Sequence, residues 1–306
     1  MNRALVAAAA TGVQVGAAIV ASRFVVSEVP PLTLALLRYA IGFLCLAPFA
    51  WPVLKLFWAS PSVGRSLLAT FSGVKDLAVM AALGIGQFAV LIALLNFGLQ
   101  HVGAGRAALI FSLFPLLTLL LSAALGRERI TPALATGVLL SIAGVALSLT
   151  PKLGAAHPGH WWGELAVLAS AGVGALCSVL YRPYLRRYPT LPVSALAMGA
   201  SVLFLAPMAL VEGWPARVAG LSAQAWAVVA FIGVSSGAGY FAWLYALKHE
   251  SPTRVTVFLA LNPVTAAVLG ALLLSEPIDG WMFAAIACIG AGLWLATRGV
   301  PVPRRR

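Results

Sequence analysis

Charged side chains are scarce in this 306-residue sequence: only 9% of its residues are Asp, Glu, Lys or Arg, whereas 61% are hydrophobic. A soluble domain has about 25% charged residues, so the composition excludes an ordinary soluble protein. The apolar runs are about 20 residues long, which suits helices that cross a bilayer and exceeds the length of barrel strands. Since lipid supplies no hydrogen-bond partners, each span must satisfy its own backbone. We therefore predict an all-α membrane protein embedded in a lipid bilayer.

Acidic residues are scarcer still, with 8 Asp and Glu against 20 Lys and Arg, for a formal net charge of +12. A face that binds nucleic acid gathers its basic residues on one soluble surface. Here the basic residues stand in short connections between apolar runs. We therefore predict no nucleic-acid partner.

Residues that could hold a metal or a cofactor are also few. The cysteines, Cys45, Cys177 and Cys288, all lie inside apolar runs, where they are expected to pack as small side chains. His157 and His160 flank Pro-Gly without another ligand cluster, which favours a turn over a metal site. The phosphate-binding pattern G-x-x-x-x-G-K-[ST] is absent, which disfavours an ATP-driven process. We predict neither a metal nor a cofactor.

The apolar runs predict ten transmembrane helices. They cover residues 4–22, 31–52, 77–99, 104–125, 132–149, 162–181, 191–211, 225–247, 253–274 and 279–297. Most connections are short, so consecutive helices are expected to be antiparallel neighbours.

Lys and Arg in these connections predict the orientation. With the N-terminus inside, fifteen of them lie on the cytoplasmic side and four outside, while Arg38 falls within a span. Cytoplasmic loops carry the excess of Lys and Arg. We therefore expect a multi-pass protein of the cytoplasmic (inner) membrane with both termini in the cytoplasm, residues 299–306 forming a basic cytoplasmic tail.

The chain contains an internal repeat. A shift of 148 residues, without a gap, superimposes the residues at 99, 101, 106, 113, 115, 121, 125, 128, 130, 144 and 147 on identical residues. We predict two five-helix units, 1–149 and 162–298, joined by an external linker at 150–161. Because five is odd, the second unit is inverted. Inverted repeats are typical of secondary transporters, whose substrate site lies between the repeats near the membrane midplane.

A glutamate marks the end of the fourth span of each unit, Glu128 in the first and Glu276 in the second. Ser275 and Thr131, each close to a proline, are typical of a helix N-terminus at this point. The favoured interpretation is therefore a helix cap at the membrane interface. A proton-binding role for either glutamate is the alternative.

These segments resemble the ten-helix EamA-type branch of the drug/metabolite transporter superfamily. The second repeat carries its most specific motifs, in the YALK turn, the proline of the ninth span and the LSE ending. In the first repeat the resemblance rests on Gly16, PPLTLALLRY and FPLLTLLLSAALGRE, while Val15 replaces a common tryptophan. The resemblance implies export of small metabolites or drugs across the cytoplasmic membrane without ATP hydrolysis.

Three amides near the middle of spans are candidate substrate-binding residues: Gln14, Gln87 and Asn262. An unpaired amide in hydrocarbon costs roughly 1–3 kcal/mol or more, so each needs a partner. Interhelical hydrogen bonding is the structural alternative. Asn262 is the strongest candidate because Pro263 frees a backbone carbonyl one turn earlier, and discontinuous helices often line transport sites.

Aromatic side chains supply the rest of the candidate binding surface: Phe111, Tyr240 and Trp243. Tyr240 and Trp243 are three residues apart and share a helix face. They could stack on an apolar or aromatic solute. A belt at the membrane interface is the alternative for Trp243.

Arg38 is the one charged residue placed well inside a span, about 10 Å deep by the rise of a helix. Such an arginine costs about 2.5 kcal/mol or more unless it reaches the interface or finds a partner. It either snorkels or faces the crevice, where it attracts a substrate carboxylate or pairs with a gating acid, Glu276 or Glu164. These two glutamates are the candidates for gating or proton-linked coupling.

The sequence therefore predicts a secondary transporter, an exporter of amino-acid-like or drug-like solutes that works by alternating access. An intramembrane enzyme is the alternative, because Gly233 to Gly237 match the G-x-S-x-G pattern around Ser235. Helix packing explains this pattern better, since His101 and His249 lie at span ends. Coupling ion and oligomeric state, monomer or homodimer, stay open.

Overall fold

The computed structural model describes residues 2–59, 74–102, 107, 110–111, 113–127, 130–149, 161–274 and 280–298. All regular elements in these ranges are helices, which confirms the predicted all-α class. In chain order they are α1 (Arg3–Val25), α2 (Pro31–Ala59), α4 (Val74–Gly84), η1 (Ile85–Val90), α5 (Leu91–His101), α7 (Phe114–Ala124), α8 (Pro132–Leu149), α9 (Trp161–Arg187), α10 (Thr190–Met208), η3 (Ala209–Glu212), α11 (Trp214–Ala219), α12 (Ala223–His249), α13 (Pro252–Thr256), η4 (Val257–Ala260), α14 (Leu261–Leu274) and α15 (Gly280–Arg298).

Several of these helices are suited to a membrane. Among the described residues, six helical segments are long and apolar enough to cross one: Arg3–Val25, Pro31–Pro48, Lys75–His101, Trp161–Arg187, Thr190–Glu212 and Ala223–His249. Three shorter apolar helices are Phe114–Ala124, Pro132–Gly144 and Phe283–Ala296. The chain is a membrane protein with several apolar spans. The residues from 150 to 160 of the predicted linker, the tail 299–306, Glu128 and Glu276 lie outside the described residues.

Short polar side chains begin several helices. The carboxamide oxygen of Asn2 accepts a hydrogen bond from the backbone N–H of Ala4 at the start of α1. Ser222 caps α12 and Ser251 caps α13 in the same manner. These caps satisfy backbone donors that lack a partner in the first turn.

Two spans depart from regular α-helical geometry. The third predicted span contains the π-helix η1 between α4 and α5, with Gln87 and Phe88 inside it. The ninth, expected as one helix over 253–274, is divided into α13, the 3₁₀ segment η4 and α14. Such departures frequently occur at functional sites.

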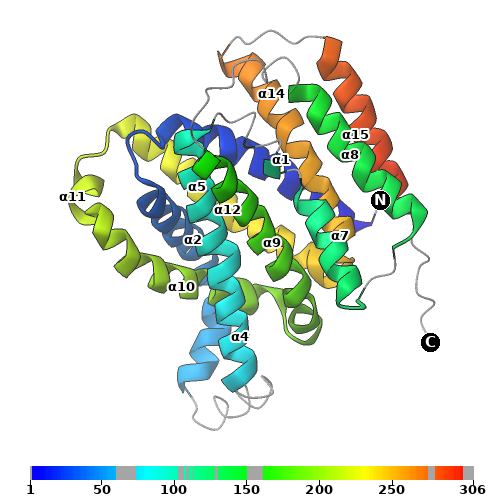
Figure 1. Cartoon of the computed structure of the whole chain (residues 1–306). Helices are drawn as coiled ribbons and strands as arrows, with labels where there is room; N and C mark the ends of the chain where they lie inside the picture. The colour runs from blue at the N-terminus through cyan, green and yellow to red at the C-terminus, as the bar shows by residue number, and fades with distance from the viewer. Residues whose placement is uncertain are drawn as a thin grey trace.

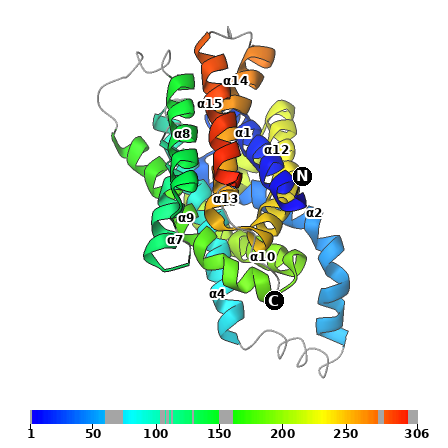
Figure 2. The same ribbon diagram turned by 90° about the vertical axis from the view of Figure 1, so that its right-hand side faces the viewer.

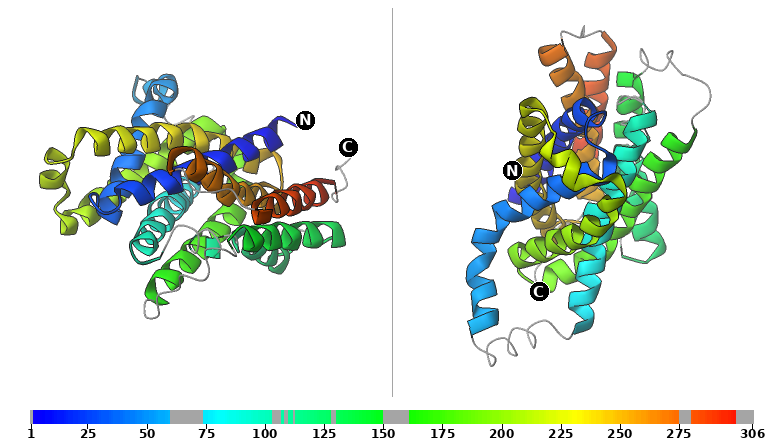
Figure 3. Two further views of the ribbon diagram at one scale, coloured as in Figure 1. Left: turned by 90° about the horizontal axis from the view of Figure 1, so that it is seen from above. Right: turned by 90° about the vertical axis from the view of Figure 1, so that its left-hand side faces the viewer.

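The helices pack around a common centre rather than in two separate bundles (Figure 1). Helix α1 packs against α12 and α14, α5 and α7 pack against α9, and α2 packs against α10 and α12. Helices α8 and α15 lie side by side along one flank (Figure 2). The far ends of α2 and α4 project beyond the other helices (Figure 3).

Glycines allow the backbones of α8 and α15 to touch. A Cβ atom at Gly137 would lie 2.6 Å from the backbone nitrogen of Ala296, and one at Gly144 would lie 2.9 Å from the carbonyl oxygen of Ala285. Real Cβ atoms essentially never approach so closely. Small residues are what permits close helix pairing in membranes, so this pair is tightly joined.

Candidate substrate-binding site

Most of the predicted substrate-binding residues lie in the protein interior. Arg38, Gln87, Phe111, Tyr240, Trp243 and Asn262 are all buried, and Gln14 is half-buried. At 3% exposure, Trp243 faces the interior, so the interface-belt interpretation of this residue is wrong. Arg38 is also 3% exposed and does not snorkel.

Arg38 lies beside an aromatic cluster formed by Tyr39, Phe88 and Tyr240. The ring centroid of Phe88 is 5.6 Å from that of Tyr39 and 4.5 Å from that of Tyr240. The hydroxyl groups of Tyr39 and Tyr240 share a hydrogen bond of 2.6 Å. The guanidinium carbon of Arg38 lies 5.8 Å from the centroid of each tyrosine ring, within range of a cation–π interaction.

A second aromatic cluster continues from the first along α12. The ring centroid of Phe114 lies 5.5 Å from that of Phe111 and 6.2 Å from that of Trp243. Gly174 of α9 packs directly against the Phe114 ring, and a Cβ atom there would overlap it. Both clusters belong to one continuous hydrophobic core, so the predicted aromatic residues lie in one connected core.

Gln14 lies between α1 and α12. Its side-chain nitrogen donates to the hydroxyl of Ser235 over 3.3 Å, and its carboxamide packs against Gly239. Ser235 also donates to the carbonyl oxygen of Ile232 at 3.2 Å. Within the described residues, no histidine contacts Ser235. The hydroxyl is therefore engaged in helix–helix contacts, as the packing interpretation expects.

Asn262 lies where the broken ninth span meets α1. A Cβ atom at Gly16 would be 2.6 Å from its carbonyl oxygen, so the backbones of α1 and α14 touch. Gly12 makes a similar contact with the carbonyl group of Phe258 in η4. Asn262 thus stands in the first turn of α14, directly after the 3₁₀ segment.

Five of the predicted residues share an unusual feature: each has a buried polar side-chain atom without a hydrogen-bond partner in the described part of the chain. These atoms are Gln14 Oε1, Arg38 Nε, Gln87 Oε1, Trp243 Nε1, and both Nδ2 and Oδ1 of Asn262. Roughly 90% or more of buried polar groups in proteins are paired, and each unpaired one costs about 1–3 kcal/mol. The set contains both hydrogen-bond donors and acceptors.

Some polar side chains in the spans have structural partners. The Asn96 side chain donates to the carbonyl oxygen of Pro31 over 3.1 Å. Glu164 is half-buried in the first turn of α9, and the described residues show no ion pair between it and Arg38. Gln87 sits in η1 directly before Phe88, but no hydrogen bond among the described residues joins it to Arg38. Glu276, the other predicted gating acid, lies outside the described residues.

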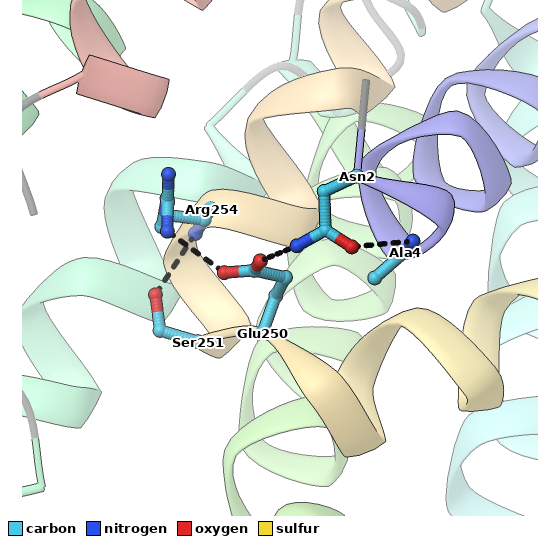
Figure 4. Close-up of polar contacts among 5 residues, drawn as sticks. All are labelled: Asn2, Ala4, Glu250, Ser251 and Arg254. Atoms are coloured by element: carbon cyan, nitrogen blue, oxygen red, sulfur yellow. Dashed lines mark hydrogen bonds and ion pairs between the residues drawn. The ribbon is translucent and has the colours of Figure 1, made fainter. Parts of the chain in front are cut away.

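One end of the helix assembly is held by a polar contact that we call the Glu250 bridge (Figure 4). The Glu250 carboxylate, just after α12, accepts a hydrogen bond from Asn2 at 2.6 Å and another from Arg254 at 2.8 Å. It therefore joins the start of α1 and the short helix α13 to the end of α12. Nearby in the chain, Lys248 donates to the carbonyl oxygen of Tyr188 over 3.0 Å.

Sequence reasoning missed Tyr39, Phe88 and Glu250. Tyr39 directly follows Arg38, but an aromatic residue in an apolar run looks like ordinary core. Its partner Tyr240 is 201 residues away. Nothing in the sequence signals this pairing.

Comparison with known proteins assigns the chain to a family. The EamA-like transporter family matches residues 2–150 and 161–298. An uncharacterised transporter of Archaeoglobus fulgidus is 27% identical over 286 residues, covering 92% of this chain and 94% of the relative. A protein of Streptantibioticus cattleyicolor named "Probable terminal-alkyne amino-acid exporter" is 30% identical over 235 residues, covering 76% and 74%.

Two further similarities are informative. An aromatic amino acid exporter of Ancylobacter novellus is 28% identical over 197 residues, which cover 63% of this chain and 66% of the relative. A solved crystal structure superimposes with a TM-score of 0.74 and 23% identity, covering 98% of both chains. That structure shows the shared fold alone.

Proposed function

The chain belongs to the EamA-like transporter family, and from this membership we propose that it exports small amino-acid-like or drug-like solutes by alternating access. Family and relatives make it a transporter of small molecules and not an enzyme. The observation that carries the proposal is the set of five predicted residues whose buried polar atoms lack a hydrogen-bond partner among the described residues. A bound solute would supply those partners.

Helix pairing supports the proposal of ten spans in two inverted repeats, 1–149 and 162–298. In that scheme α1 corresponds to α9, α5 to α12 and α7 to α14. The contact of α1 with α12 then has its equivalent in α9 with α5, and that of α1 with α14 in α9 with α7. The pairs α2–α10 and α8–α15 map onto themselves. Such a two-fold arrangement is expected of a transporter built from repeats.

The proposed site lies between these halves. Arg38 and Gln87 come from the first unit, and Tyr240, Trp243 and Asn262 come from the second. Relative movement of the halves would therefore change the site, as alternating access requires. The aromatic rings suit an apolar body, and the single guanidinium suits one anionic group rather than a multiply charged solute.

The orientation proposal rests on the charge bias. Fifteen Lys and Arg fall on the side of the termini and four on the other, which supports cytoplasmic termini in the inner membrane. We retain Glu164 and Glu276 as candidates for proton-linked gating. Dependence of efflux on an imposed proton gradient tests that role, and mass measurement of the purified complex tests monomer against homodimer.

The function is tested by a resistance screen on overexpressing cells, followed by uptake of the labelled hits into proteoliposomes. L-phenylalanine and L-tryptophan are the first solutes, because a relative is named an aromatic amino acid exporter. Gln87→Leu and Asn262→Leu should change the preference among solutes at normal expression. The matched control is Asn96→Leu, which removes a structural hydrogen bond to Pro31 and should lower folded yield without altering preference.

Two results would contradict the proposal. One is unchanged transport per folded molecule in both the Gln87 and Asn262 variants, which would return these amides to a packing role. The other is hydrolysis of a supplied ester or peptide that Ser235→Ala abolishes, which would favour the enzyme alternative.

A further inference from the structure

Among the described residues, Arg38 is contacted by aromatic rings and not by an acid. It is 3% exposed, and no carboxylate among the described residues pairs with it. Its guanidinium carbon is equidistant, at 5.8 Å, from the ring centroids of Tyr39 and Tyr240. Desolvated cation–π contacts offset part of the cost of burying the cation, but they leave its Nε–H, which has no hydrogen-bond partner among the described residues, available to an anion.

The position of those rings is fixed by one hydrogen bond between the two halves. Tyr39 comes from α2 and Tyr240 from α12, and their hydroxyl groups are 2.6 Å apart. Tyr39 is fully buried, and Phe88 of η1 packs on both rings. The two tyrosine rings therefore hold the guanidinium between them, and the hydrogen bond between their hydroxyl groups keeps the two rings together.

We propose that Tyr39 is a positioning residue: through its hydroxyl bond to Tyr240 it orients the Arg38 guanidinium toward the anionic group of the solute, and so determines the preference for anionic over neutral solutes. The proposal rests on the proposed function of this site. Without the bond, the Tyr240 ring loses its restraint from α2, and the guanidinium samples orientations in which its donors no longer converge on one anion.

The test compares two probes that differ in the anionic group. L-phenylalanine carries a carboxylate, whereas L-phenylalaninamide has the same body with a neutral amide. Equilibrium binding and transport of both are measured on the full-length protein in nanodiscs and proteoliposomes. Tyr39→Phe keeps the ring and removes only the hydroxyl, so it should weaken binding of L-phenylalanine about fivefold, the equivalent of one hydrogen bond. Binding of L-phenylalaninamide should change less than twofold.

A double substitution separates a positioning role from a general disturbance of the site. Because one bond is shared, Tyr240→Phe should give the same loss as Tyr39→Phe, and the double variant should be no worse than either single one. Tyr181→Phe is the matched control, since this buried tyrosine donates to the carbonyl oxygen of Met80 at 2.8 Å, whereas the rings that contact the Arg38 guanidinium are those of Tyr39 and Tyr240. It should leave the ratio of the two affinities unchanged.

Three outcomes would overturn the inference. The first is equal weakening of both probes in Tyr39→Phe, and the second is additive loss in the double variant. A wild-type protein that binds both probes equally would also overturn it, while transport of neutral solutes in the screen would leave the proposed function standing.

Discussion

Neutralising the Glu250 bridge should destabilise the protein measurably. Glu250→Gln keeps the size of the side chain but removes its charge. The side chain is 11% exposed and that of Arg254 is 14% exposed, so solvent screens the pair only weakly. In the native protein the carboxylate accepts one hydrogen bond from Asn2 at 2.6 Å and one from Arg254 at 2.8 Å.

The expected magnitude follows from those two bonds. A hydrogen bond to a charged group contributes about 1.5–3 kcal/mol. Glutamine retains one acceptor, which can serve Asn2, but it cannot serve Arg254 as an anion. We therefore expect the free energy of unfolding to fall by about 2 kcal/mol, roughly the worth of one charge-assisted bond.

Reversible unfolding of the purified protein in mixed micelles measures this change. The control is Glu28→Gln, because Glu28 is exposed and its carboxylate is 3.4 Å from the Ser222 hydroxyl, so its loss should leave stability unchanged. Equal unfolding free energies for Glu250→Gln and the wild type would refute the reasoning. They would mean that water replaces the bridge at no cost.

Three further predictions concern packing, capping and orientation. Gly16→Ala would place a Cβ atom 2.6 Å from a backbone oxygen of α14. It should therefore lower the free energy of unfolding by at least about 1–3 kcal/mol. Gly172→Ala, which has open space at its Cβ, should be tolerated in the same unfolding assay. Glu212 accepts hydrogen bonds from two backbone N–H groups and a hydroxyl at the start of α2. Glu212→Ala should therefore lower the free energy of unfolding by about 1–2 kcal/mol. An unchanged unfolding midpoint would argue against this cap. A cysteine replacing Arg187 should resist an impermeant thiol reagent in intact cells while one replacing Trp162 reacts, and the reverse pattern would invert the topology.

Much of the helical architecture could be predicted from the sequence, because the membrane requires long apolar runs and most of the described helices coincide with them. The departures from regular α-helical geometry could not be predicted. The 3₁₀ turn at Val257–Ala260 touches Gly12 of α1, and a contact across 246 positions leaves no local trace in the sequence. The π-helix at Ile85–Val90 likewise lies in a run that reads as ordinary α-helix.

The candidate site was also predictable only in part from the sequence, and the chemistry of each residue decided which part. Arg38, Gln87 and Asn262 stand out because a polar side chain in an apolar run needs a reason. Tyr39 and Phe88 do not stand out, since aromatic residues fill cores everywhere. Their part in the site becomes visible only when three helices are placed together.

The π-helix also has a consequence for how this site could diverge in evolution. A π turn holds one residue more than an α turn, and here the backbone N–H of Leu91 bonds to the carbonyl of Gly86, five residues earlier. Deleting one residue from Ile85–Val90 would restore a continuous α-helix without breaking the span. Because the π turn accommodates its extra residue locally, the side chains of α4 and α5 would keep their faces, and the change would be confined to the turn that holds Gln87 and Phe88. A single codon lost at this point would therefore shift Gln87 and Phe88 on the inner face in one mutational step while leaving the rest of the span in place.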